Sequence, residues 1–175
     1  MTAARPHISP SPTPTQVMAE APPQVLTIRP ALLADVTEVV RVLNESAEGG
    51  FTLPRTSSEV EFHLGGFVVA TLDDRVEGCA ALETINPTLA EVRSVAVGRA
   101  AAGTGVGRAM MTWLVDEARA LEFEMLCLLT RVPGFFARFG FIDVEPLELP
   151  GVYMDRAIRA RGRSLDGRVG MILTL

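Results

Sequence analysis

The feature that most constrains the fold of this 175-residue chain is a strand, a glycine-rich turn and a helix in immediate succession. Residues 90–97 alternate like a strand, Gly103-Thr104-Gly105-Val106-Gly107 forms a turn of small residues, and a helix is predicted to begin at about Arg108. Amides in such a turn and in the first helical turn lack internal partners, and the helix dipole adds partial positive charge. The stretch therefore predicts a cradle for phosphate oxygens.

Two common nucleotide-binding motifs are excluded by the residues that follow the glycines. A Walker phosphate loop needs Lys and then Ser or Thr after its last glycine, whereas Arg108 and Ala109 follow Gly107 here. A dinucleotide fingerprint needs a small residue three positions after its second glycine. That position is Arg108 or Met110, depending on which glycine pair is counted, so this motif is excluded as well.

Composition narrows the class of protein. Apolar residues make up 48% and charged residues 21%, which is typical of one globular domain. The net charge of −5, without a block of Lys or Arg, argues against a nucleic-acid partner, and no stretch is long and apolar enough to predict a membrane span. Cys79 and Cys127 lie in apolar runs that favour buried thiols, and with only His7 and His63 besides them we expect no metal site and a cytoplasmic location.

The order of predicted elements indicates a single α/β layer structure. Residues 1–24, with six prolines, are predicted to be a disordered leader before one domain at residues 25–175. The predicted strands cover residues 25–28, a hairpin of 67–72 and 76–82 across Asp73-Asp74, then 90–97, 125–130 and 171–175. The predicted helices are one capped by Asp35 with Val36, Val39, Val40 and Leu43 on its apolar face, a short one at 58–63, one that buries Met110, Trp113, Leu114, Ala118 and Leu121, and a short one through Arg138.

Three segments together resemble the GNAT superfamily of N-acetyltransferases. The turn at residues 103–107 resembles that family's acetyl-CoA loop, residues 90–97 its splayed fourth strand, and residues 135–141 its closing segment, an aromatic pair followed by Gly-Phe. The resemblance implies one domain with a mixed, mostly antiparallel twisted sheet, a splayed pair of fourth and fifth strands, and flanking helices. It also implies acetyl-CoA as co-substrate, held by Val95, Ala96, Val97, Gly103, Thr104, Gly105, Val106, Gly107 and Arg108. Ala102 stands where the family usually has Arg or Gln.

The same resemblance suggests the proton-transfer groups. Glu91 lies where many members of the superfamily place a catalytic glutamate, and a carboxylate can take the proton of an ammonium group directly or through water. Glu83, on the preceding strand, is the second candidate. Phe136 occupies the position of the family's usual tyrosine acid, and Tyr153 is the one tyrosine that could replace it.

Three arginines suggest the acceptor. Arg55, Arg93 and Arg131 are expected near the acceptor mouth, and arginine binds carboxylates through paired donors. These residues, together with residues 78–82, 91–97, 129–131 and 135–136, resemble the acetyltransferase domain of bacterial N-acetylglutamate synthases. The resemblance implies L-glutamate as acceptor, held by the three arginines, in the first step of arginine biosynthesis.

Two alternatives stay open at this point. The acceptor could be another small amine or amino acid, with the arginines in structural roles, or the chain could be a CoA-binding module without turnover. Residues 144–163 are predicted to be either a loop over the acceptor mouth or a dimer contact, because many domains of this type form homodimers.

Overall fold

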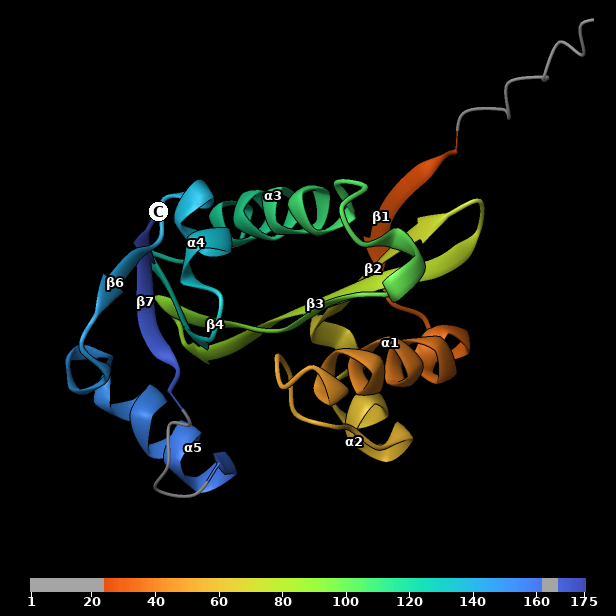
Figure 1. Cartoon of the computed structure of the whole chain (residues 1–175). Helices are drawn as coiled ribbons and strands as arrows, with labels where there is room; N and C mark the ends of the chain where they lie inside the picture. Colours follow the sequence, from red (N-terminus) through yellow and green to blue (C-terminus); the bar gives the residue numbers. More distant parts are fainter. Residues whose placement is uncertain (1–23, 162–166) are drawn as a thin grey trace, which may run out of the picture.

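The computed structural model of the chain describes residues 24–161 and 167–175, so nearly all of the predicted leader lies outside the described residues. Within the described residues the chain forms a single seven-stranded sheet of order β1-β2-β3-β4-β5-β7-β6 (Figure 1). Only the β4–β5 pair is parallel in this part of the chain, which confirms the predicted mixed, mostly antiparallel sheet. The strands are β1 (Leu26–Pro30), β2 (Phe67–Leu72), β3 (Arg75–Asn86), β4 (Leu89–Val97), β5 (Met125–Thr130), β6 (Ile142–Val144) and β7 (Val169–Thr174).

Helices cover both faces of the sheet. In Figure 1, α3 lies on one face, while α1 and α2 lie on the other. The helices and short 3-10 turns are α1 (Val36–Glu48), α2 (Ser57–Phe62), α3 (Val106–Ala120), α4 (Pro133–Phe136) and α5 (Gly151–Arg161), with η1 (Leu33–Asp35), η2 (Leu64–Gly66), η3 (Arg99–Ala101), η4 (Ala137–Phe139) and η5 (Pro146–Glu148). Each face therefore has its own apolar core.

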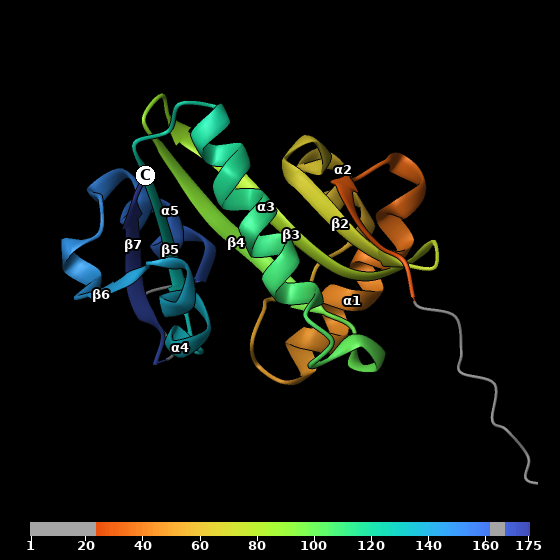
Figure 2. The ribbon, with the colours of Figure 1, turned by 90° about the horizontal axis from the view of Figure 1, so that it is seen from above.

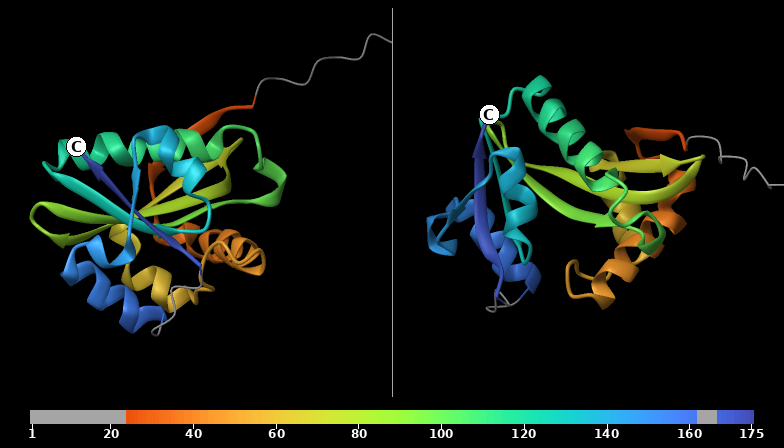
Figure 3. Two further views of the ribbon diagram at one scale, coloured as in Figure 1. Left: turned by 60° about the vertical axis from the view of Figure 1, so that its left-hand side comes forward. Right: turned by 45° about the horizontal axis from the view of Figure 1, so that its top comes forward.

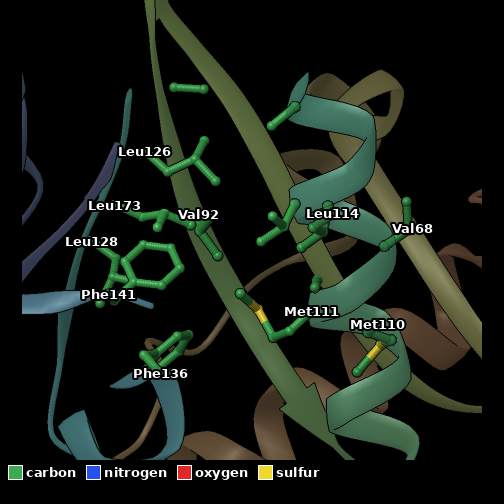
Figure 4. Close-up of a cluster of buried hydrophobic side chains, with 14 of the residues drawn as sticks. Val68, Val92, Met110, Met111, Leu114, Leu126, Leu128, Phe136, Phe141 and Leu173 are labelled. Atoms are coloured by element: carbon green, nitrogen blue, oxygen red, sulfur yellow. The ribbon is translucent and has the colours of Figure 1, made fainter. Parts of the chain in front are cut away.

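The larger core lies between α3 and the sheet. Figure 4 shows Met111 of α3 pointing toward Val92 of β4, with Met110 and Leu114 on the same helix, and each of these four side chains is at most 3% exposed. The helix starts at Val106, two residues earlier than predicted. Leu121, predicted to be buried, is 54% exposed and lies directly after the end of the helix at Ala120.

The weakest predictions concern the C-terminal part of the chain. Strand β7 begins at Val169 and not at Met171, and neither β6 nor α5 was predicted. Strand β6 has only three residues, too few to show alternation, and α5 begins among Pro and Gly residues that suggested a loop. Helix α5 packs on the sheet through Tyr153, Met154 and Ala157, so residues 151–161 are a covering helix.

A β-bulge in β4 changes which side chains face which core. Pairing with β3 moves from Cys79–Ala96 to Ala81–Arg93, so β4 has one extra residue there, and Ser94 has a φ of +54°. On one side of the bulge, Val92 packs in the α3 core; on the other side, Val95 packs against that core and Ala96 belongs to the α1 core. The inward and outward alternation of β4 is therefore reversed at Ser94.

The parallel pairing of β4 with β5 is short. It comprises Leu89–Met125, Ala90–Leu126 and Glu91–Cys127, and beyond these pairs the described residues of the two strands do not pair with each other. Figure 2 shows the strands meeting at one end and separating toward the start of α3, and the right-hand view of Figure 3 shows the resulting wedge. The predicted splay of the fourth and fifth strands is confirmed.

An ion pair fixes the connection from β1 to α1. The Asp35 carboxylate accepts hydrogen bonds from the Arg29 guanidinium at 2.6 and 2.9 Å and from the Leu32 amide at 2.7 Å. The Arg29 hydrogen bond is the largest cause that lowers the pKa of Asp35 below its ordinary value of 3.8. Because this pKa is lower in the folded chain, the stabilisation is present above pH 4 and is lost as the pH falls through the folded value.

We predict that Asp35→Asn lowers the free energy of unfolding by about 2 kcal/mol at pH 7, because a partly buried charged hydrogen bond is lost. Urea unfolding followed by circular dichroism measures this difference, which should shrink below pH 4. The matched control is Asp116→Asn, since Asp116 pairs with Arg119 on the exposed face of α3. An equal loss of stability in both variants would contradict the stabilising role of the Asp35–Arg29 ion pair.

Candidate functional site

The wedge between β4 and β5 contains a cavity of about 290 Å³. Its walls come from both diverging strands, from the loop between α1 and α2, from α4, and from single residues of α3, α5 and the segment before β7. The lining residues are Ser46, Phe51, Thr52, Leu53, Arg55, Glu91, Val92, Arg93, Ser94, Val95, Ala96, Val97, Gly107, Leu128, Leu129, Thr130, Val132, Phe135, Phe136, Ala157 and Arg168. Segments far apart in the sequence therefore meet at the point where the sheet opens.

Glu91 lies at the closed end of the wedge, because its pair with Cys127 is where the parallel ladder stops. It is 6% exposed and lines the cavity. Burial and, as a smaller cause, the nearby charge of Glu91 together raise the pKa of the Cys127 thiol to about 12. Cys127 is therefore a neutral thiol behind Glu91, and Glu91 is the ionisable group that faces the cavity at this point. Burial also raises the pKa of Cys79 to about 12.

Arg93 is fixed by an ion pair with the carboxylate of Glu83. Its Nη1 donates a hydrogen bond to Oε2 of Glu83, and Oε1 of Glu83 is 3.6 Å from Nδ1 of His63. The Nε of Arg93 is buried and has no hydrogen-bond partner among the described residues. A buried donor of this kind is costly unless an acceptor reaches it, so Arg93 is suited to bind an anionic group. Glu83, the second candidate for proton transfer, is engaged with Arg93 and does not line the wedge cavity.

Arg55 is positioned by the end of α1. The side-chain amide of Asn44 accepts a hydrogen bond from the Arg55 amide at 2.9 Å and donates one to its carbonyl at 3.3 Å. Thr52, in the same loop, donates to the carbonyl of Leu43 at 2.9 Å. The loop is thus fastened at two points, and the Arg55 side chain lines the cavity while its Nη1 lies 3.4 Å from Glu59.

Of the three predicted arginines, Arg131 does not line the cavity, whereas a fourth arginine, Arg168, does. Arg131 is exposed and is not among the lining residues, although a Cβ on Gly50 would lie 2.8 Å from its Nη1. Arg168 is 8% exposed and lines the cavity, and it was not predicted. The pairing of Thr130 with Val169 places Arg168 next to Arg131 in register. A prediction that the last strand begins at Val169 would therefore have identified Arg168 as a neighbour of Arg131.

The glycine turn has the geometry of an anion cradle. Gly103 and Gly105 have φ angles of +78° and +93°, and the space around each is open to a ligand. The Ala109 amide donates to the Gly105 carbonyl at 3.0 Å, so the amides of residues 106–108 precede the first helical hydrogen bond and have no partner within the helix. Thr104 closes the turn by donating to Ala101 at 2.7 Å. These residues fit a pyrophosphate group.

The predicted cofactor residues fall into two groups. Val95, Ala96, Val97 and Gly107 line the cavity. Gly103, Thr104, Gly105 and Arg108 are exposed and are not among its lining residues, and Val106 is 1% exposed, so only its backbone amide is available to a ligand. Because β4 has no ladder partner among the described residues on the β5 side beyond Glu91, its backbone from Val95 to Val97 can pair with an extended ligand as another strand would.

No tyrosine hydroxyl lines the wedge cavity in the described residues. Phe136 is buried in the cavity wall and stacks edge-to-face on Phe135 and Phe141. Tyr153, the alternative acid, lies in a separate apolar cluster with Leu89 and Cys127. Tyr153 therefore does not replace the missing tyrosine in this arrangement.

Two other classes of site were tested on the described residues. No group of three or more His, Cys, Asp or Glu side chains in this part of the chain could hold a metal ion. A search of the same residues finds no helix with the length and apolar character that a membrane crossing requires.

Comparison with known sequences identifies relatives along most of the chain. A family model described as Acetyltransferase (GNAT) family matches residues 36–141, which is more than half of the sequence. An uncharacterized N-acetyltransferase of Chlorobaculum tepidum is 30% identical over 152 residues, covering 85% of this chain and 96% of that protein. The amino-acid acetyltransferase of Mycobacterium tuberculosis is 31% identical over 136 residues, covering 76% of this chain and 78% of that protein.

Comparison with solved structures gives the same fold. The crystal structure of Rv2747 from Mycobacterium tuberculosis, a complex that contains CoA, has a TM-score of 0.76 and 29% identity, and covers 85% of this chain and 99% of that one. N-acetylglutamate synthase from Neisseria gonorrhoeae, complexed with coenzyme A and N-acetyl-glutamate, has a TM-score of 0.77 and 26% identity. The match covers 86% of this chain but 35% of that synthase, so the likeness concerns one part of the longer protein.

We predict that Gly105→Ala weakens CoA binding about fivefold, because a φ of +93° costs a residue with a Cβ about 1 kcal/mol. Isothermal titration calorimetry with CoA measures the change. Gly151→Ala is the control, since Gly151 has an ordinary φ and open space around it. Equal affinity in the Gly105 variant and the wild type would mean that the turn does not contact the ligand.

Proposed function

Because the chain belongs to the acetyltransferase (GNAT) family and is an acyltransferase, we propose that it transfers an acetyl group from acetyl-CoA to the α-amine of L-glutamate. The observation that carries this proposal is one buried carboxylate, Glu91, in a cavity lined by Arg55, Arg93 and Arg168. The amino-acid acetyltransferases and the N-acetylglutamate synthase among the similar proteins support the same acceptor class.

On the co-substrate side, residues 103–108 would hold the pyrophosphate of acetyl-CoA with backbone amides. The backbone of Val95 to Val97 on the side of β4 that faces β5 would pair with the pantetheine arm and direct the thioester into the wedge, where an amide of Val95 or Ala96 can donate to the developing oxyanion. Acetyl-CoA supplies the activated acyl group, and the protein supplies position and hydrogen bonds.

Glu91 is the proposed general base. An α-amine with a pKa of about 8 is mostly protonated at neutral pH, so a carboxylate must take a proton before the nitrogen can attack. The position of Glu91 at the closed end of the wedge supports this role, because the reacting amine and the thioester can both reach that point.

The arginines are the proposed acceptor ligands. Arg55 and Arg168 approach the cavity from the loop after α1 and from the segment before β7, and the buried Nε of Arg93 offers one further donor. Two carboxylates on one small acceptor would match several guanidinium groups. Arg131, next to Gly50, is proposed to contact the acceptor as it enters.

No dedicated acid is needed for the departing thiolate, because a thiol with a pKa of about 8.5 is a fair leaving group at neutral pH. The phenylalanine at position 136 then keeps water out of the wedge. We further propose that the protein acts in the cytoplasm at the start of arginine biosynthesis, that residues 1–24 are a leader to one domain at 25–175, and that homodimers form.

An amino acid with a single carboxylate is the second candidate acceptor. Arg55 lies near Glu59, and Arg93 is bound to Glu83, so part of the positive charge around the cavity is already balanced. Glutamine differs from glutamate only in the side-chain charge and therefore separates the two candidates directly.

The test of the proposed function is the release of CoA thiol from acetyl-CoA with each common L-amino acid and with simple polyamines. Turnover with glutamate well above that with glutamine and aspartate is expected. Preference for glutamine would support the second candidate. CoA binding without turnover on any amine would indicate a CoA-binding module.

We predict that Glu91→Gln lowers kcat at neutral pH by about 100-fold or more, the usual contribution of a general base, with little change in either KM. The residual rate should rise with pH as the amine loses its proton without help. A pH profile from pH 6 to 10 measures this, with the exposed Glu124→Gln variant as control. A profile parallel to that of the wild type would exclude Glu91 as the base.

We predict that Arg55→Lys and Arg168→Lys each raise the KM for glutamate about tenfold and change the KM for acetyl-CoA less than twofold, because paired donors to a carboxylate are lost. Initial rates with each substrate varied in turn measure both constants. Arg119→Lys, on the exposed face of α3, is the control. Parallel changes in both constants would assign these arginines to the structure of the wedge.

A further inference from the structure

A second cavity, of about 490 Å³, lies at the open edge of β3. Pairing of β2 with β3 ends at Phe67–Ala81, whereas β3 continues to Asn86, and Figure 2 shows β3 running on under α3 past the end of β2. The cavity is bordered by the segment from Phe62 to Phe67 on one side and by the C-terminal half of α3 on the other. It is separate from the wedge between β4 and β5.

The lining of this second cavity combines aromatic rings with carboxylates. Trp113 and Glu117 lie four residues apart on one face of α3, and Leu121, the residue after the end of the helix, continues the same line along the cavity. Phe62, which is 84% exposed, and Glu83 lie among the other lining residues. Ring faces and carboxylates both attract positive charge, and the surrounding apolar surface favours a ligand with a hydrocarbon part.

The charges in the cavity favour a cation over an anion. Glu83 and Glu117 are the carboxylates of the lining, and the charge of Arg93 is balanced by its ion pair with Glu83. His63, the other basic group, lies 3.6 Å from the same carboxylate. Among the described residues that line this cavity, an anion would meet the carboxylates of Glu83 and Glu117, and the one arginine, Arg93, is already in an ion pair.

Arg93 connects the two cavities, because it lines both of them. Its Nη1 is bound to Glu83, which lines the second cavity, while its buried Nε has no partner among the described residues. A cation placed beside Glu83 would compete with Arg93 for electrostatic attraction to that carboxylate. The hold of Glu83 on Arg93 would then weaken, and the guanidinium would be more available to an anion in the wedge.

We propose that the second cavity binds a small organic cation with an apolar group, and that its occupancy strengthens acceptor binding through Glu83 and Arg93. The second half of this proposal rests on the proposed function, since it requires an acidic acceptor in the wedge. Coupling between two sites is reciprocal, so the acceptor must strengthen the binding of the cation by the same factor.

The first experiment measures binding alone. Trp113 is the only tryptophan of the chain, so its fluorescence reports directly on the second cavity. The probe is benzyltrimethylammonium, whose nitrogen carries no hydrogen and cannot be acetylated. We expect a saturable change in emission at constant ionic strength, and a smaller one with the neutral 2-phenylethanol.

Two variants with the same change in charge locate the probe. Glu117→Gln should raise its Kd about fivefold, as expected for one partly exposed charge pair, whereas Glu124→Gln, which lies outside the lining, should leave it unchanged. Isothermal titration calorimetry measures the Kd of the probe for each variant independently of Trp113 fluorescence. Absence of saturation, equal effects of the two variants, or displacement of the probe by CoA would each overturn the site.

The second experiment measures coupling. Saturation with L-glutamate and CoA should lower the Kd of benzyltrimethylammonium about fivefold, at the lower end of common coupling factors. Glu83→Gln should abolish this coupling while the probe still binds beside Glu117 and Trp113. A Kd independent of glutamate in the wild type would overturn the coupling. If glutamate itself fails to bind, the proposed function and the coupling fall together, while the first experiment still decides the site.

Discussion

The early end of the parallel ladder between β4 and β5 is the constraint on which the rest of the molecule depends. Two strands that separate inside a sheet leave backbone donors and acceptors without partners, and the gap must be filled. Here Phe136 and Phe141 pack with Val92 and Leu128 on the α3 side, as Figure 4 shows, while the other side stays open as a cavity. Within the described residues, the fold thus provides a strand edge without a ladder partner beside a cavity, where an extended ligand can pair as a further strand would.

Arginine placement shows how such a pocket can carry positive charge without losing order. Arg93 is fixed by Glu83, and Arg55 is positioned through its backbone by Asn44. A guanidinium that is already oriented loses less side-chain entropy when an anion arrives. The carboxylates behind these arginines reduce the net charge, but they keep the donors in place.

The sequence predicts the site better where chemistry is local than where it depends on register. The glycine turn and the limits of β2 and β5 follow from short patterns and agree with the structure. Arg168 could not be found in this way, because its place depends on the pairing of β7 with β5 across a segment of weak periodicity. The bulge at Ser94 was also invisible, since nothing in a run of β-branched and small residues marks the extra residue.

The bulge at Ser94 divides β4 into two parts whose side chains alternate in opposite phase. The side chain of Val92, before Ser94, and those of Val95 and Val97, after it, all point to the core under α3. An uninterrupted strand would place Val92 and Val95 on opposite faces of the sheet. Substitutions in this strand act on one contact at a time. Removal of a single residue there would instead remove the bulge and move the side chains on one side of it to the opposite face of the sheet, so the length of this segment matters as much as its side chains.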